Sequence, residues 1–175
     1  MIDFNKPYIT EEDYNYIQDA LMSKKVCGDG KYTKLVTQWF FDQGVGNLLL
    51  TTSGSSALDM SAILSGLNSE DEVILPSYTF VSTANAFLLQ NAKIVFAEVD
   101  PRTMNIDLED VKKKITSKTK VICPVHYAGT SCDMNELLNI AKESNIKIIE
   151  DAAQGVAETI SSSWVIRATG RYASS

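Results

Sequence analysis

The chain has 175 residues, of which 45% are hydrophobic and 22% charged, and its formal net charge is −6. This composition excludes a disordered or collagen-like chain, and an acidic chain lacks the basic face that nucleic-acid-binding proteins use. The sequence contains no apolar run near the roughly 18 residues that cross a bilayer, no signal peptide at its start, and only scattered cysteines. We therefore expect a cytoplasmic protein without a nucleic-acid or membrane partner.

The first predicted helix begins at Thr10. The sequence Thr-Glu-Glu-Asp resembles a capping box, and Tyr14, Ile17 and Leu21 follow at helical spacing. A loop with the sequence CGDGK at 27–31 then interrupts the pattern, since glycine and aspartate favour turns.

A second helix is predicted at 33–42. Its apolar spacing indicates that Leu35, Val36 and Trp39 point inward. The apolar run at 47–51 is predicted to form a short strand.

Helical and strand patterns alternate from residue 55 onward. This alternation predicts βαβ units, and therefore an α/β fold with a largely parallel sheet. Ligands bind such sheets at the carboxyl ends of the strands, so the segments that follow strands are the places to look for function. The predicted helices are 55–67, 81–90, 107–115 and 133–144, and the predicted strands are 72–75, 93–99, 120–125 and 146–150.

A serine-rich segment, TSGSS at 52–56, connects a predicted strand to a predicted helix. Free N–H groups at a helix start, a glycine and two hydroxyls can cradle a phosphate. The alternative is a plain serine N-cap, which needs only one hydroxyl. The segment matches neither the P-loop nor the GxGxxG dinucleotide fingerprint, and both interpretations stay open.

Three other residues follow strands and have two interpretations each. Asp151 can hold a ligand nitrogen or a metal, or it can cap a helix beginning at Ala152; its neighbour Glu150 is expected on the opposite face of the strand. Phe80 can stack on a flat ligand or belong to the core. His126, the only histidine, can be a general base, but a hydrogen-bonded scaffold role is favoured, and a multi-histidine metal site is excluded.

Six stretches together resemble one family. The DegT/StrS sugar aminotransferases are pyridoxal-phosphate (PLP) enzymes of the aspartate aminotransferase fold, known as fold type I. The resemblance runs from residue 1 to about 157 and implies the N-terminal part of the large PLP-binding domain, without the C-terminal domain. The matching stretches are CGDGKYT (27–33), PSYTFVSTANAF (76–87), KIVF (93–96), TMNID (103–107), PVHYAG (124–129) and EDAAQGV (150–156).

The resemblance implies a role for each residue of a PLP site. Ser55 and Ser56 would bind the cofactor phosphate, and Phe80 would stack on the pyridine ring. Asp151 would pair with the pyridine nitrogen and keep it protonated, which makes the ring a better electron sink. Gln154 would donate to the phenolic oxygen of the cofactor.

The resemblance also implies a substrate and a partner. The loop formed by Gly28, Asp29 and Gly30 would lie near the nucleotide-sugar site. The family reaction would move an amino group, from glutamate through PLP, to a dTDP-4-keto-6-deoxyhexose for surface polysaccharide synthesis. Members of the family act as homodimers.

Two features depart from the family. The lysine that holds PLP as a Schiff base would lie beyond Ser175, whereas the last lysine here is Lys147, so no catalytic residue is assigned. The alternative function is therefore a non-catalytic remnant or a dimerisation partner. The segment 158–175 has an aberrant composition with no helical or strand period. Two origins of this segment are considered. One is a frameshift near residue 160, because the codons of the segment, read one base out of phase, can encode a family-like sequence. The other is a short paralogue with its own tail.

Overall fold

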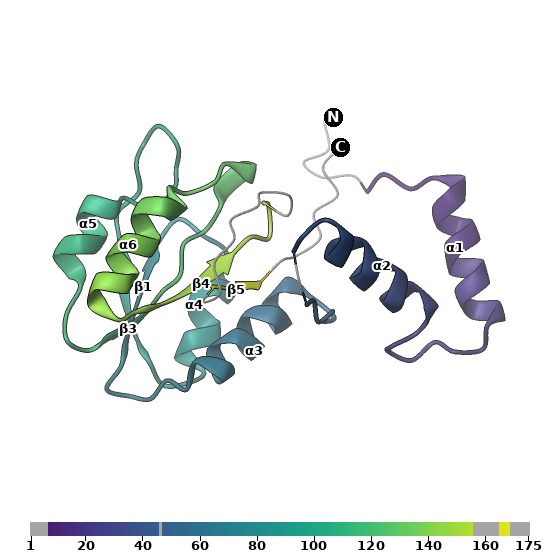
Figure 1. Ribbon diagram of the computed structural model, residues 1–175, viewed down its shortest axis with the longest axis horizontal. Coiled ribbons are helices and arrows are strands. Elements are labelled where there is room, and N and C mark those ends of the chain that lie inside the picture. The colour runs from purple at the N-terminus through teal and green to yellow at the C-terminus, as the bar shows by residue number, and fades with distance from the viewer. Residues whose placement is uncertain (1–6, 46, 156–164, 169–175) are drawn as a thin grey trace. The chain divides into compact units, whose positions relative to one another are not determined.

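The computed structural model describes residues 7–45, 47–155 and 165–168, which fall into two units (Figure 1). One unit contains helices α1 and α2, and the other begins at Thr51 and contains every later element. No helix in these ranges combines the length and apolar character needed to span a bilayer.

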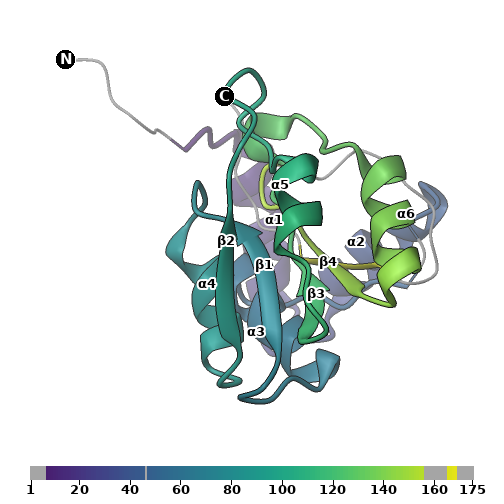
Figure 2. The ribbon, with the colours of Figure 1, turned by 90° about the vertical axis from the view of Figure 1, so that its left-hand side faces the viewer.

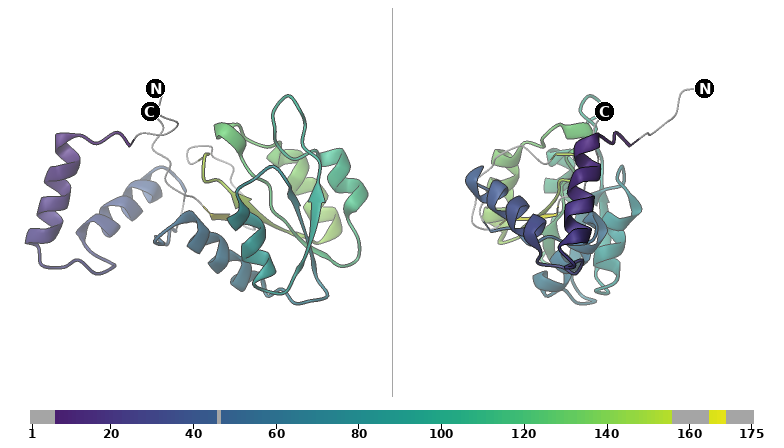
Figure 3. Two further views of the ribbon diagram at one scale, coloured as in Figure 1. Left: turned by 180° about the vertical axis from the view of Figure 1, so that it is seen from behind. Right: turned by 90° about the vertical axis from the view of Figure 1, so that its right-hand side faces the viewer.

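The first unit consists of α1 (Glu11–Met22) and α2 (Lys31–Asp42), seen from behind in the left view of Figure 3. The predicted capping box is confirmed, because the Thr10 hydroxyl accepts from the Asp13 N–H while the Asp13 carboxylate accepts from the Thr10 N–H. Neither helix contains a buried residue. Polar contacts and an edge contact between the rings of Tyr16 and Tyr32, rather than a buried core, therefore hold these two helices.

Two predictions for this part of the chain are wrong. Leu35 and Trp39 do not point inward but are 54% and 58% exposed, because helical spacing identifies an apolar face without identifying what covers it. The run 47–51 is not a strand. A strand needs a neighbour for its backbone groups, and within the described ranges no ladder pairs this segment.

The second unit is built around a parallel sheet with strand order β2-β1-β3-β4-β5 (Figure 2). The predicted α/β architecture is therefore confirmed. The predicted strands and helices beyond residue 55 each occur within a few residues of their predicted bounds. The strands are β1 (Glu72–Pro76), β2 (Lys93–Ala97), β3 (Thr119–Ile122), β4 (Lys147–Asp151) and β5 (Val165–Ala168).

Helices cover both faces of this sheet, as parallel sheets require. Along β1, Val73 and Leu75 pack with Leu58 of α3 and Phe87 of α4, whereas Ile74 packs on the opposite face. This alternation is the period of two that every strand has. The helices of the first face are α3 (Gly54–Ser65) and α4 (Val81–Leu88), and those of the second are α5 (Leu108–Lys114) and α6 (Met134–Ser144).

Strand β5 corrects one prediction about the segment 158–175. No strand period was expected there, but Val165–Ala168 pairs in parallel with β4, from Ile148 to Asp151. Four residues are too few for a period to be recognised, and the pairing is supplied by the neighbouring strand. The proposed domain boundary at 157 lies outside the described residues, so the boundary and the origin of this segment stay predictions.

Candidate functional site

The carboxyl ends of β1, β3 and β4 lie at one edge of the sheet, because the three strands are parallel. An isolated bridge between Val125 and Asp151 extends the pairing of β3 and β4 to this edge. Asp151 therefore ends its strand directly beside the segment that follows β3. The structure brings Ser55, Phe80, Asp151 and Gln154 to this edge.

Asp151 is buried, with 4% of its surface exposed. Its Oδ2 accepts from the Thr83 hydroxyl at 2.7 Å, and its Oδ1 accepts from the Ala153 N–H at 3.2 Å. Among the described residues no lysine or arginine forms an ion pair with it. A buried carboxylate held only by neutral donors is suited to a cationic ligand group, since each oxygen can accept further hydrogen bonds.

The helix expected to begin at Ala152 is absent, since residues 152–155 form a turn. Asp151 still accepts from the backbone two residues ahead, so part of the capping geometry is present. The nearby Cys123 thiol carries no charge. Burial raises the pKa of Cys123 well above its usual value, and the Asp151 carboxylate raises it further.

The serine-rich segment 52–56 contains the start of α3. Ser53 is the N-cap and accepts from the Ser56 N–H at 3.1 Å, so the predicted capping role is present. The Ser55 hydroxyl donates to Ser82 Oγ of α4 at 2.8 Å. The N–H groups of a first helical turn have no partner within the helix. Hydroxyls and a helix N-terminus therefore occur together here, as phosphate binding needs.

Gln154 lies on the turn that follows β4. Its Oε1 accepts from the Ala128 N–H at 2.6 Å. Because a backbone N–H can only donate, this contact fixes the orientation of the amide and leaves the Nε2 hydrogens for a ligand oxygen. Ala128 has a φ of 51° and Gly129 a φ of 77°, so this left-handed turn is what aims the Ala128 N–H at Gln154.

Buried Asn105 holds that turn in place. Its Oδ1 accepts from the Tyr127 N–H at 3.1 Å, and its Nδ2 donates to the carbonyls of Thr130 and Ser131, each at 3.0 Å. All three contacts come from one side chain in the segment between β2 and α5. Asn105 therefore fixes the backbone that orients Gln154.

Phe80 is the N-cap residue of α4 and is 66% exposed, so the alternative that it belongs to the core is wrong. A ring on the surface of the carboxyl edge is available to stack on a flat ligand. Nearby, the rings of Tyr78 and Tyr127 contact each other with centroids 4.4 Å apart. These tyrosines follow β1 and β3 and add aromatic surface to the same edge.

His126 has the favoured scaffold role. It is buried, and its Nδ1 accepts from the Cys132 N–H at 3.2 Å, so its Nε2 carries the hydrogen and donates to Glu150 at 2.9 Å. Glu150 therefore lies on the face opposite Asp151, as predicted. A Cβ on Gly155 would come within 3.0 Å of the His126 side chain, which explains the glycine at this position.

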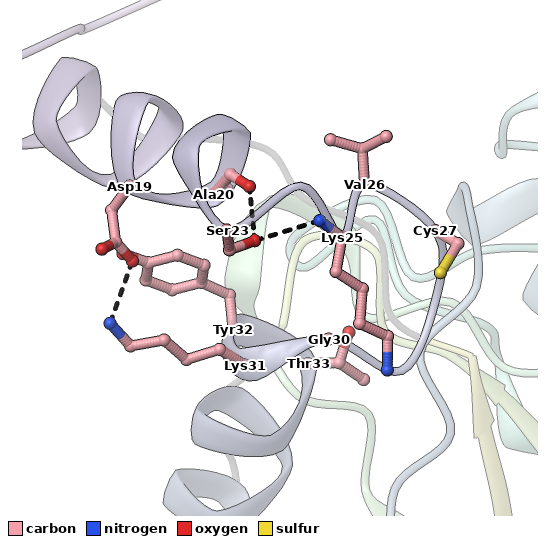
Figure 4. Close-up of a pocket in the computed structure, with 10 residues that line it drawn as sticks. All are labelled: Asp19, Ala20, Ser23, Lys25, Val26, Cys27, Gly30, Lys31, Tyr32 and Thr33. Atoms are coloured by element: carbon pink, nitrogen blue, oxygen red, sulfur yellow. Dashed lines mark hydrogen bonds and ion pairs between the residues drawn. The ribbon is translucent and has the colours of Figure 1, made fainter.

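The loop Gly28-Asp29-Gly30 belongs to the first unit. Of its three residues, Gly30 lines a cavity of about 250 Å³ that Asp19 and Lys31 also line, shown in Figure 4, whereas Gly28 and Asp29 are not among the lining residues. The Lys31 ammonium lies 2.9 Å from the Asp19 carboxylate, and the Tyr32 hydroxyl donates to the same carboxylate at 2.8 Å. Hydrogen bonds from Lys31 and then Tyr32 lower the pKa of Asp19.

Sequence reasoning missed three residues that support the site: Ser82, Thr83 and Asn105. All three occur within stretches that carry the family resemblance. Apart from Thr79, which precedes Thr83 by four residues, their side-chain hydrogen-bond partners are 22 to 68 residues away along the chain. Spacing alone gives no signal for such contacts.

The chain is similar to known proteins over most of its length. The model of the DegT/DnrJ/EryC1/StrS aminotransferase family matches residues 7–174. An uncharacterized protein of Methanocaldococcus jannaschii is 37% identical over 153 residues, 86% of this chain and 39% of that protein. The GDP-perosamine synthase of Caulobacter vibrioides is 32% identical over 154 residues, 87% of this chain and 42% of the enzyme.

A solved structure shows the same fold. NtdA from Bacillus subtilis, with bound cofactor PMP, superposes with a TM-score of 0.79 at 31% identity, over 86% of this chain and 36% of that one. The sheet described above thus matches the N-terminal part of fold-type-I aminotransferases. The chain spans about two fifths of the length of the relatives it matches. Because the family model covers nearly all of its residues, the chain belongs to the DegT/DnrJ/EryC1/StrS aminotransferase family.

Proposed function

We propose that the carboxyl edge of this sheet binds the cofactor PLP or its amino form, pyridoxamine phosphate (PMP), as part of a sugar aminotransferase. The family uses PLP, which supplies an electron sink and carries the amino group between donor and acceptor. The observation that carries the proposal is Asp151, a buried carboxylate whose two partners are both neutral donors. A protonated pyridine nitrogen is the cationic partner that this carboxylate fits.

The other described residues fit the same group. Ser55 and Ser56 supply hydroxyls at the start of α3, where a phosphate dianion is favoured. Phe80 has an exposed ring that can cover the pyridine. Gln154 has its carbonyl oxygen occupied by the Ala128 N–H, so its amide hydrogens can donate to the phenolic oxygen. In this assignment Asp151 keeps the ring nitrogen protonated, and the remaining residues orient the cofactor.

The proposed acceptor is a dTDP-4-keto-6-deoxyhexose and the proposed amino donor is glutamate. This is the reaction of a dTDP-4-amino-4,6-dideoxygalactose transaminase, which makes the sugar of enterobacterial common antigen. A GDP-perosamine synthase among the relatives supports a nucleotide sugar as substrate. We also propose that Gly28, Asp29 and Gly30 contact that substrate and that the protein acts in the cytoplasm as a homodimer.

Titration of the chain with PMP tests the cofactor site, because PMP has no aldehyde that could react with surface lysines. Asp151→Asn should weaken PMP binding at least tenfold, which corresponds to about 1.4 kcal/mol. The matched control is Asp71→Asn. Asp71 is also buried and held by neutral donors, from Asn68, but it lies at the amino end of β1. Equal affinity of the Asp151→Asn variant and the unmodified chain would refute the proposed site.

A further inference from the structure

The first turn of α4 contacts both ends of the proposed cofactor site. Ser82 accepts from Ser55 at the phosphate end, and the next residue, Thr83, donates to Asp151 at the ring-nitrogen end. Phe80 is the N-cap residue of the same turn. One short stretch of helix is therefore connected to every part of the site except Gln154.

Thr83 has the most constrained contacts of these residues. It is completely buried, and its Oγ1 lies 2.7 Å from Asp151 Oδ2 and 2.8 Å from Thr79 Oγ1. A threonine hydroxyl has one hydrogen, and an ionised carboxylate can only accept. Since Thr83 gives its hydrogen to Asp151, Thr79 must donate to Thr83. The three residues form a directed chain of hydrogen bonds from Thr79 through Thr83 to the carboxylate.

We infer that Thr83 is a positioning residue, which fixes the Asp151 carboxylate in the orientation that receives the ring nitrogen of the cofactor. This inference rests on the proposed function. Two donors hold the carboxylate, one on each oxygen, so its plane is set before any ligand binds. A carboxylate that is already oriented loses no side-chain freedom when the cofactor binds, which favours affinity.

A structural role alone is the competing explanation, because the same hydrogen bond joins α4 to β4. The two roles differ in their dependence on Asp151. A positioning role acts on affinity only through the carboxylate, so its effect must vanish when the carboxylate is replaced. A structural role must persist in that background, as a double-mutant cycle can show.

The test is PMP affinity of the 175-residue chain and its variants, measured by the fluorescence of PMP. Thr83→Val should weaken binding about fivefold to tenfold, which lies within the range for loss of a typical intramolecular hydrogen bond. Thr83→Ser, which keeps the hydroxyl, should stay within about twofold of the unmodified chain. In the Asp151→Asn background, Thr83→Val should change affinity by less than about twofold.

Thr116→Val is the matched control for the loss of a hydroxyl. Thr116 donates to the Glu72 carboxylate at 2.7 Å, the same kind of contact at the amino end of β1. This variant should leave PMP affinity unchanged. If Thr83→Val does not fold, Thr83→Cys compared with Thr83→Ser replaces it, because the two side chains are similar in size and the thiol is only a weak donor.

The outcomes separate this inference from the proposed function. If Asp151→Asn weakens binding but Thr83→Val does not, the proposed function stands and the positioning role is overturned. An equal effect of Thr83→Val with and without Asp151 also overturns it, in favour of a structural role. If the unmodified chain does not bind PMP at all, both the proposed function and this inference are wrong.

Discussion

The two units of this chain depend on different kinds of interaction. The unit that begins at Thr51 has two clusters of buried apolar side chains, one on each face of its sheet. Helices α1 and α2 have no buried residue and are stabilised by a capping box and by the contacts of Lys31 and Tyr32 with Asp19. Apolar patterning therefore determines packing in one unit, whereas polar contacts and the ring contact of Tyr16 with Tyr32 hold the helices of the other.

The difference limits what a hydrophobic pattern can predict. Tyr14 and Ile17 of α1 have the same helical spacing as Leu137 and Ile140 of α6, yet the first two are exposed and the second two are buried. In α6 the sheet covers the apolar face. Spacing thus predicts which side of a helix is apolar in both units, but the coverage of that side depends on the rest of the fold.

The largest expected effect is on the free energy of unfolding, when an aromatic side chain is truncated in each unit. Phe87→Ala should lower the free energy of unfolding by about 3–5 kcal/mol, because Phe87 is completely buried between α4 and the sheet. Trp39→Ala removes a larger ring from exposed α2 and should change the free energy of unfolding by less than about 0.5 kcal/mol. Urea unfolding followed by circular dichroism measures both. A loss above 2 kcal/mol for Trp39→Ala would show that α2 has a packed partner.

Loss of a helix N-cap should have a smaller effect, which is expected to differ between the two units. Thr10→Ala in α1 and Asp107→Ala in α5 each remove a side chain that accepts from first-turn N–H groups, at a cost of about 1 kcal/mol. In α5 this loss should lower the stability of the whole packed unit. In α1 it should instead increase fraying of that helix, because no core couples α1 to other elements. Amide hydrogen exchange of residues 11–22 and 108–114 distinguishes the two outcomes. Identical global destabilisation by both variants would contradict the comparison.

The smallest expected effect is a pH dependence confined to α1 and α2. The pKa of Asp19 is lowered by its hydrogen bonds to Lys31 and Tyr32. A lowered pKa in the folded chain means that the contact stabilises above the ordinary pKa of aspartate and is lost as the pH falls through the folded value. Amide chemical shifts of residues 31–34 should therefore change in acid. Asp19→Asn should abolish this change, and its persistence in the variant would exclude Asp19 as the cause.

Much of the second unit could be predicted because its elements carry local signals. Gly66 ends α3 with a φ of 69°, Asp107 and Asp133 cap α5 and α6, and short apolar runs mark the buried strands. Because the strands are parallel, their carboxyl ends at Pro76 and Asp151 lie on the same edge of the sheet. The predicted strands and their parallel order therefore predict the edge on which the site lies.

The partners of the site residues could not be predicted in this way. The hydrogen bond from Thr83 to Asp151 joins residues 68 positions apart, and the pattern of α4 gives no sign of which hydroxyl faces β4. Strand β5 was missed for a related reason, since its pairing with β4 is a property of the sheet and not of its four residues. Motifs thus indicate the residues proposed to contact the ligand. The residues that hydrogen-bond to those side chains are identified only in the folded structure.

In the proposed cofactor site Asp151 faces a protonated pyridine nitrogen. The most direct measurement is the ¹⁵N chemical shift of PMP labelled at its ring nitrogen, bound to the chain and to the Asp151→Asn variant. In the unmodified chain the ring nitrogen should stay protonated up to a pH above that at which free PMP loses this proton. In the variant the proton should be lost at a lower pH. A bound ring nitrogen that titrates identically in both proteins would contradict it.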